Sequence, residues 1–228
     1  MMAEGLSALL ALALQAPPAP APPTVPSTMP IDLAASFVGA EQALARVSAC
    51  IATPGFIMTP VSLNTLDNRF QALARDAVGV WGPQTPTEIV DQLPVDCASE
   101  HLSALATTAE TQVTRVATRM TALLQPMSTG LWFGALPLCG GGLVKAELVA
   151  DSYTAAESVT ITLSPDKAIE LGTLTRRHVG HALALREGGR VVMEPIIQEP
   201  IEGGQVQISG PERDELDRVI AAAEACKR

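Results

Sequence analysis

Serine and lysine at a spacing typical of acyl-transfer enzymes occur once in the chain. Ser164 and Lys167 form the pattern Ser-x-x-Lys, which carries the nucleophile in penicillin-binding enzymes. Those enzymes also need the patterns Ser-Asp-Asn and Lys-Thr-Gly, and the sequence contains neither. Because Ser164 directly precedes Pro165, we expect it to cap a helix and not to act as a nucleophile.

Histidine and glutamate pairs indicate metal or glycosidase chemistry only weakly. His178 and His181 are about one helical turn apart, but a glycine between them breaks the helix and no third ligand is close in sequence. Glu194, Glu199 and Glu202 resemble paired glycosidase carboxylates, but they fall in an expected loop. The chain also lacks P-loop, Gly-x-Ser-x-Gly and dinucleotide-binding patterns. We therefore predict no catalytic residues, no metal, no cofactor and no enzymatic activity.

The four cysteines favour two disulfide bonds. They are Cys50, Cys97, Cys139 and Cys226, and none forms a Cys-x-x-Cys pair, which disfavours zinc binding and thioredoxin-type redox chemistry. Three pairings are possible in an exported protein, and four buried free thiols in a cytosolic protein are the alternative. Cys50 ends one expected helix and Cys97 begins another, so an antiparallel packing favours Cys50–Cys97. The pair Cys139–Cys226 would then join the two ends of the second domain.

Apolar residues at spacings of three and four predict a helical domain over residues 31–128. One stripe covers residues 33–51, and a second covers residues 66–77 and stops near Gly79. A short helix is expected from Thr85, and a long helix over residues 97–124. These stripes predict the core of a small helical bundle.

The C-terminal part predicts a small α+β domain with an antiparallel sheet over residues 143–228. Alternation and turn residues predict strands at 143–149, 159–163, 182–185, 190–193 and 205–209, with helices at 165–178 and after Pro211. Residues 129–142 form a glycine-rich connector between the two domains. Its run Leu131-Trp132-Phe133 would be costly to leave in water, so we expect a plug between the domains and not an exposed binding patch.

Composition limits the location and the partners of the protein. The net charge of -9, with 15 Lys+Arg against 24 Asp+Glu, disfavours binding of nucleic acid. Residues 1–16 contain a short apolar block that predicts a signal peptide, and residues 17–30 form a proline-rich tether. No apolar run approaches the roughly 20 residues of a membrane-spanning helix, so we expect no stable membrane span. We predict an exported, periplasmic protein, with a cytoplasmic location as the alternative.

Several segments of the C-terminal part, in the same order, resemble the head of the first periplasmic domain of SecD, a subunit of the bacterial protein-export translocase. They are Ser158 to Ser164, Leu174-Thr175-Arg176, Val179 to Leu185, Gly189 to Val192, Pro195-x-Ile197-x-x-Pro200-Ile201-x-Gly203-Gly204, and Gln207 to Gly210. The chain departs from the usual SecD pattern at Gly188-Gly189, where SecD has Asp-Gly, and at Met193-Glu194, where SecD has small residues. The resemblance covers about a quarter of the chain.

The resemblance implies a non-enzymatic role in protein export. In the translocase this head is thought to hold emerging polypeptide on the periplasmic side. The membrane helices that couple SecD to proton flow have no counterpart in this sequence, so we expect no proton-driven motor. The implied partners are an unfolded or exported polypeptide, or a translocase or other envelope complex.

The segment from Pro195 to Gly204 is the candidate binding site. Its prolines prevent ordinary sheet pairing but leave some backbone groups free to pair with an extended chain. The candidate residues are Pro195, Ile196, Ile197, Pro200, Ile201, Gly203 and Gly204. For Ile197 and Ile201 we favour packing in the domain's own core. The alternative function is a structural or scaffold protein of the envelope, which uses the head only as a stable interaction domain and binds its partner through the helical bundle.

Overall fold

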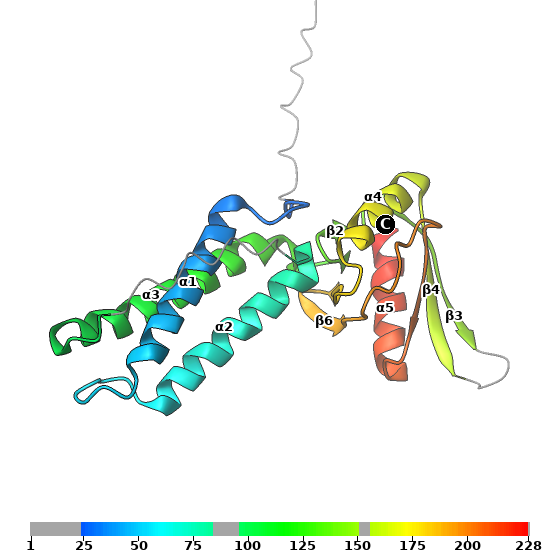
Figure 1. Cartoon of the computed structure of the whole chain (residues 1–228). Coiled ribbons are helices and arrows are strands. Elements are labelled where there is room, and N and C mark those ends of the chain that lie inside the picture. Colours follow the sequence, from blue (N-terminus) through cyan, green and yellow to red (C-terminus); the bar gives the residue numbers. More distant parts are fainter. Residues whose placement is uncertain (1–23, 84–95, 151–155, 228) are drawn as a thin grey trace, which may run out of the picture.

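The computed structural model describes residues 24–83, 96–150 and 156–227. Three helices form an elongated unit, here called the arm, and the remaining elements form a second unit, here called the head, at one end of it (Figure 1). The expected signal peptide, the first half of the proline-rich tether and the short helix from Thr85 lie outside the described residues. The predicted α+β class is confirmed. No helix of the described ranges has the length and apolar character needed to cross a membrane.

The arm consists of α1 (Ile31–Cys50), α2 (Pro60–Trp81) and α3 (Ser99–Leu124). Helices α1 and α3 bury the predicted stripes against each other, with Leu33, Ala40, Val47, Ala109, Val113 and Val116 in the core. Helix α2 begins earlier than its apolar stripe because Thr59 caps it: the Thr59 hydroxyl accepts a hydrogen bond from the Ser62 amide at 3.1 Å. The helix ends before Gly82, because the φ of 86° at this residue lies outside the range of a right-handed helix.

The described residues of the head form two antiparallel sheets, two helices and a short 3-10 turn, η1 (Gln125–Ser128). One sheet has the order β2-β1-β5-β6, made of β2 (Leu136–Pro137), β1 (Leu131–Phe133), β5 (Leu185–Glu187) and β6 (Arg190–Met193). The other has the order β3-β4-β7, made of β3 (Leu143–Ala150), β4 (Glu157–Leu163) and β7 (Gln205–Ser209). Helices α4 (Pro165–Arg177) and α5 (Arg213–Cys226) complete the head core.

The connector differs from its prediction because it contains strands. Residues 131–137 form β1 and β2, and β1 pairs with β5 from Leu131↔Glu187 to Phe133↔Leu185. Alternate side chains of β1 enter different cores: Trp132 packs in the arm core, whereas Leu131 and Phe133 pack in the head core. The expected burial of this run is therefore observed, but through a strand that both units share.

The strand expected at residues 182–185 lies later than predicted. Strand β5 covers Leu185–Glu187 and not residues 182–185. Gly188 and Gly189 have φ values of 55° and 81° and form the two-residue turn between Glu187 and Arg190. As a result Glu187 belongs to a strand instead of a turn, which fixes where its side chain lies.

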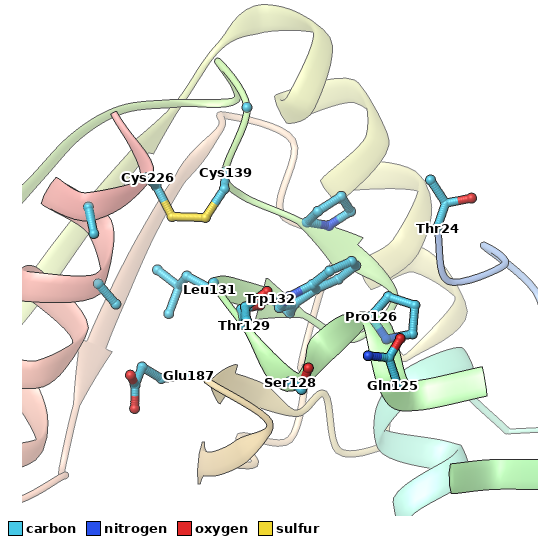
Figure 2. A pocket seen from close by; sticks show the side chains of 15 residues that line it. Thr24, Gln125, Pro126, Ser128, Thr129, Leu131, Trp132, Cys139, Glu187 and Cys226 are labelled. Atoms are coloured by element: carbon cyan, nitrogen blue, oxygen red, sulfur yellow. Dashed lines mark hydrogen bonds between the residues drawn. A yellow bond between two sulfur atoms is a disulfide. The ribbon is translucent and has the colours of Figure 1, made fainter. Parts of the chain in front are cut away.

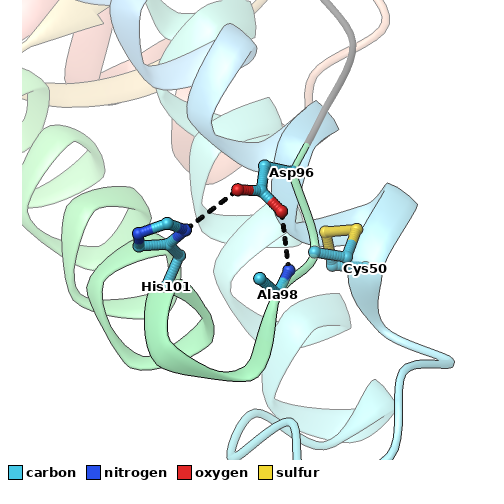
Figure 3. Close-up of a disulfide and its surroundings, with 5 residues drawn as sticks. Cys50, Asp96, Ala98 and His101 are labelled. Atoms are coloured by element: carbon cyan, nitrogen blue, oxygen red, sulfur yellow. Dashed lines mark hydrogen bonds and ion pairs between the residues drawn. A yellow bond between two sulfur atoms is a disulfide. The ribbon is translucent and has the colours of Figure 1, made fainter.

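Two disulfide bonds tie chain segments together, and they are the pairs that the cysteine positions favoured. Cys139 and Cys226 join the end of the β1–β2 hairpin to the last turn of α5, with 4.5 Å between their Cα atoms (Figure 2). Cys50 and Cys97 join the end of α1 to the segment before α3, with 5.5 Å between their Cα atoms (Figure 3).

The carboxylate of Asp96 orders the chain beside the arm disulfide (Figure 3). It accepts hydrogen bonds from the Ala98 amide at 2.9 Å and from the His101 ring at 3.1 Å. The bond from the Ala98 amide lowers the pKa of Asp96, because it stabilises the ionised carboxylate. Asp96 therefore fixes the start of α3 at the point where the disulfide holds it.

The end of α2 forms the junction between arm and head. A helix leaves its last carbonyl groups without intrahelical partners. Here the Val80 carbonyl accepts a hydrogen bond from the Ala135 amide at 3.0 Å, and the Gly79 carbonyl accepts one from the Ala184 amide at 2.9 Å. Asp76 also forms an ion pair with the buried Arg186 of β5. Backbone amides of the head thus cap the C-terminal end of α2.

Candidate functional site

The segment from Pro195 to Ile197 runs beside residues 179–183 without forming a regular strand. The Pro195 carbonyl accepts from the Leu183 amide at 3.0 Å, and the Ile197 amide donates to the His181 carbonyl at 3.0 Å. These two bonds flank the antiparallel bridge Ala182↔Ile196. In such a pair the residues between the bonds direct their own N–H and C=O away from each other. The backbone groups of Ile196 therefore face outward from this pairing.

The predicted site residues divide into an exposed group and a structural group. Ile196 is 53% exposed, whereas Ile197 is 6% exposed and packs in the head core. Ile201 is half-buried, and its amide donates to the Thr175 hydroxyl at 2.9 Å. Pro195 and Pro200 are half-buried as well.

The two glycines of the segment have different surroundings. Gly204 is buried, its carbonyl accepts from the Leu163 amide at 2.8 Å, and a Cβ there would lie 2.6 Å from that of Ala168. Gly203 is exposed and nothing lies within 4 Å of a Cβ placed on it. Gly204 is thus needed for packing. Within the segment, only Ile196 offers a large exposed apolar side chain.

An open sheet edge leads into this segment. Strand β6 is the last strand of its sheet, so one side of it carries no partner strand among the described residues. After Met193 the chain continues directly into the paired residues Pro195 to Ile197. Val191 on β6 and Ile196 beyond it are both exposed apolar residues. The edge from Arg190 to Ile197 combines unpaired backbone groups with apolar side chains, which is the combination that an added strand requires.

A pocket that the sequence did not predict lies beside the disulfide of the head (Figure 2). It has a volume of about 770 Å³ and lies between η1, the β1–β2 hairpin, β5 and the last turns of α5. Its walls include Pro126, Leu131, Trp132, Pro137, Ala225 and the two sulfur-bearing residues Cys139 and Cys226. Because these residues come from distant parts of the chain, no spacing in the sequence indicates the pocket.

The residues considered for catalysis or metal binding do not form a site. Lys167 forms an ion pair with Glu170 at 2.8 Å, and Ser164 occupies the N-cap of α4 without a side-chain capping bond. Glu202 pairs with Arg176 at 2.9 Å, whereas Glu194 lies near Arg186. No group of three or more histidine, cysteine or acidic side chains suitable for a metal occurs in the described ranges.

The two histidines of the His-x-x-His pattern have separate environments. His181 is exposed, whereas His178 is fully buried. The two ring nitrogens of His178 lie 2.9 Å from the Leu174 carbonyl oxygen and 3.1 Å from the Val78 carbonyl oxygen. Burial lowers the pKa of His178, and the two carbonyl contacts partly oppose that shift. This histidine joins head and arm.

Comparison with known proteins shows what the head is similar to. Residues 131–222 match the family described as SecDF, P1 head subdomain. The resemblance to SecDF is confirmed. The matched range includes β1 and β2, so the SecDF-like part begins within the expected connector. The boundaries of the N-terminal segments remain predictions.

Curated relatives show the same similarity over a limited range. The chain is 36% identical over 73 residues to the protein translocase subunit SecDF of Thermus thermophilus. The matched stretch covers 32% of this chain and 10% of that protein. It is 35% identical over 76 residues to the protein translocase subunit SecD of Acidaminococcus fermentans. Here the matched stretch covers 31% of this chain and 18% of that protein. The chain therefore spans less than a fifth of the length of these relatives.

Two solved structures of SecDF were also found by comparison of folds. One is described as a membrane component that enhances protein export, with a TM-score of 0.34, 20% identity, and coverage of 87% of this chain and 89% of that one. The other is SecDF in a super-membrane-facing form, with a TM-score of 0.35, 18% identity, and coverage of 87% and 27%.

Proposed function

We propose that this protein is a non-enzymatic, periplasmic accessory module of protein export that holds polypeptide segments in extended form. The similarity of residues 131–222 to the SecDF P1 head supports the role in export. The main support for the proposed binding site is the position of Ile196. This residue is exposed and has outward-facing backbone groups next to the open edge of β6.

The proposed mode of binding is addition of a strand to this edge. A polypeptide in extended form pairs its backbone with β6 and with Ile196, and its apolar side chains cover Val191 and Ile196. Backbone pairing is independent of sequence, which suits a module that holds many different chains.

Replacement of Ile196 with aspartate tests the site. The assay measures binding of the full chain to a reduced and alkylated protein that cannot fold, using a reporter dye on that polypeptide. We expect Ile196→Asp to weaken binding at least tenfold, because a charge replaces an apolar contact and must be desolvated by the added strand.

Ile169→Asp is the matched control, because Ile169 is 72% exposed on α4 and lies outside the edge. This variant should bind the unfolded chain like the wild type. Equal binding by Ile196→Asp and the wild type would reject the edge as the site and would favour the scaffold function. A photo-crosslinker at position 196 in cells adds a second readout: capture of exported chains or translocase subunits supports the proposal, and capture of one unrelated envelope protein contradicts it.

A further inference from the structure

The pocket beside the head disulfide contains one charged side chain, Glu187. The other lining residues are apolar, small or neutral polar. Glu187 is half-buried at the end of β5, opposite Leu131 of β1. No hydrogen bond or ion pair to its carboxylate is present within the described part of the chain. A carboxylate that is partly removed from water and lacks a partner favours a cation as its ligand.

The walls around Glu187 suit the flexible apolar stem of a cationic side chain. Figure 2 shows Trp132 in the middle of the pocket, with Pro126 on one side and the disulfide on the other. The Trp132 indole N–H donates to the Thr129 carbonyl at 2.8 Å, so this hydrogen bond holds the ring in place. Apolar walls and one carboxylate together suit an ammonium or guanidinium group on an alkyl chain.

We propose that this pocket binds a lysine or arginine side chain of a polypeptide segment, with Glu187 as the counter-ion. The volume of about 770 Å³ lies within the range of roughly 300–1,000 Å³ that is usual for ligand sites, and it holds one such side chain together with its neighbours. The choice of a polypeptide as the carrier of the cation rests on the proposed function. The net charge of -9 further favours cationic segments over acidic ones.

The pocket is distinct from the open edge at Ile196. Glu187 is on β5, and β6 lies between β5 and the outer edge of the sheet. None of Pro195, Ile196 and Ile197 lines the pocket. The two sites can therefore be inactivated separately, and a polypeptide that pairs with the edge need not place a cation in the pocket.

The test uses the full chain and two synthetic pentapeptides blocked at both ends, Ala-Leu-Lys-Leu-Ala and Ala-Leu-Gln-Leu-Ala. Binding is followed by calorimetry at low and high salt. We expect the lysine peptide to bind the wild type at least fivefold more tightly than the glutamine peptide, and the preference to shrink as salt rises. Glu187→Gln should abolish the preference, whereas Glu110→Gln, which removes an exposed carboxylate from α3, should keep it.

A second variant keeps the proposal testable if Glu187→Gln alters the fold. Ala225 is exposed on α5 and lines the pocket, so Ala225→Trp fills the space without touching the core. It should block the lysine peptide and leave the fold unchanged by circular dichroism.

Three results would overturn the proposal. They are no binding of the lysine peptide to the wild type at millimolar concentration, an unchanged preference in Glu187→Gln, and binding of n-hexylamine as tight as that of the peptide, which would assign the pocket to small amines. The variant Ile196→Asp separates this proposal from the proposed function. Loss of unfolded-chain binding in Ile196→Asp, with the lysine preference intact, supports both sites. Retention of unfolded-chain binding in Ile196→Asp, with a lysine preference that Glu187→Gln removes, rejects the edge and keeps the pocket.

Discussion

The ring Nε2 atom of His178, at the end of α4, lies 3.1 Å from the carbonyl oxygen of Val78 in α2, one hundred residues earlier in the chain. The other ring nitrogen lies 2.9 Å from the Leu174 carbonyl oxygen. A neutral imidazole has one N–H, so it satisfies one of these two acceptors, whereas an imidazolium satisfies both but must be buried as a cation. One of the contacts that join arm and head therefore depends on the protonation state of this side chain.

We expect the stability of the protein to fall as the pH decreases below about 6.5, the ordinary pKa of histidine. Burial lowers the pKa of His178 in the folded state, so the unfolded chain binds a proton at a higher pH than the folded one does. The stabilisation is therefore fully present above pH 6.5 and is lost as the pH falls toward the folded-state pKa, at up to about 1.4 kcal/mol per pH unit. Urea unfolding between pH 7.5 and 5.0 measures this.

The variant His178→Gln isolates the contribution of this histidine. It removes the titration and keeps a side-chain donor, so its free energy of unfolding should vary less with pH in this range than that of the wild type. His181→Gln changes an exposed ring and should behave like the wild type. If the two variants show the same pH dependence, His178 does not control it.

Removal of one partner of the Asp76–Arg186 pair should destabilise the protein strongly. Arg186 is buried, and its Nε atom has no hydrogen-bond partner in the described structure. Asp76→Ala removes the ion-pair partner of this buried cation, so we expect a loss of about 3 kcal/mol, the lower end of the range for a buried pair, because Asp76 is partly exposed. The double variant Asp76→Ala/Arg186→Met should recover part of the loss. Denaturant unfolding of the wild type, Asp76→Ala, Arg186→Met and the double variant gives the coupling energy, and additive losses would show that the pair is not coupled.

A methyl group at Gly134 should loosen the junction between arm and head. Gly134 has a φ of 48°, and a Cβ there would lie 2.7 Å from the Val80 carbonyl oxygen and 2.8 Å from a Leu183 methyl group. We expect Gly134→Ala to lower the free energy of unfolding by about 3 kcal/mol, through strain and overpacking together. Gly140→Ala is the control, since Gly140 has a φ of 82° but no atom within 4 Å of a Cβ, and should cost only about 1 kcal/mol. Similar losses in the two variants would show that close packing at Gly134 is unimportant.

The two disulfides should contribute almost equally to stability but differently to binding. Their cysteines are separated by 47 and 87 residues, and loop entropy depends only on the logarithm of loop length, so replacing either pair with serine should cost about 4 kcal/mol. Only the pair Cys139–Cys226 lines the pocket, so only its loss should remove the preference for the lysine peptide. Thermal unfolding and peptide calorimetry on both double variants check this. Loss of the preference in the Cys50/Cys97 variant alone would contradict it.

The sequence predicted those helices and strands in which the spacing of apolar residues or a capping pattern is visible over several residues. The stripes of α1 and α3, the capped helix α4 and strand β7 occur close to their expected positions. The helix positions also favoured Cys50–Cys97 and Cys139–Cys226, because both pairs lie at element ends that the predicted packing brings together.

The missed features depend on contacts between distant residues. Strands β1 and β2 have three and two residues, which is too short for alternation to be visible. In the sequence, His178 is recognisable only as a possible metal ligand together with His181. Its ring contacts the Leu174 carbonyl, four residues earlier, and the Val78 carbonyl in α2, which is distant in the sequence. Ile196 is exposed and Ile197 is buried in the core, as favoured for Ile197, because successive side chains of an extended segment point to opposite sides.

Strand β1 has a consequence for how the protein unfolds. Trp132 completes one core and its two neighbours complete the other, so neither core survives intact when the strand detaches. Arm and head should therefore melt together in a single calorimetric transition, although they look like separate bodies (Figure 1). If the head holds a polypeptide as proposed, a force that pulls this polypeptide away would act on the arm as well, because the three residues of β1 pack in both cores.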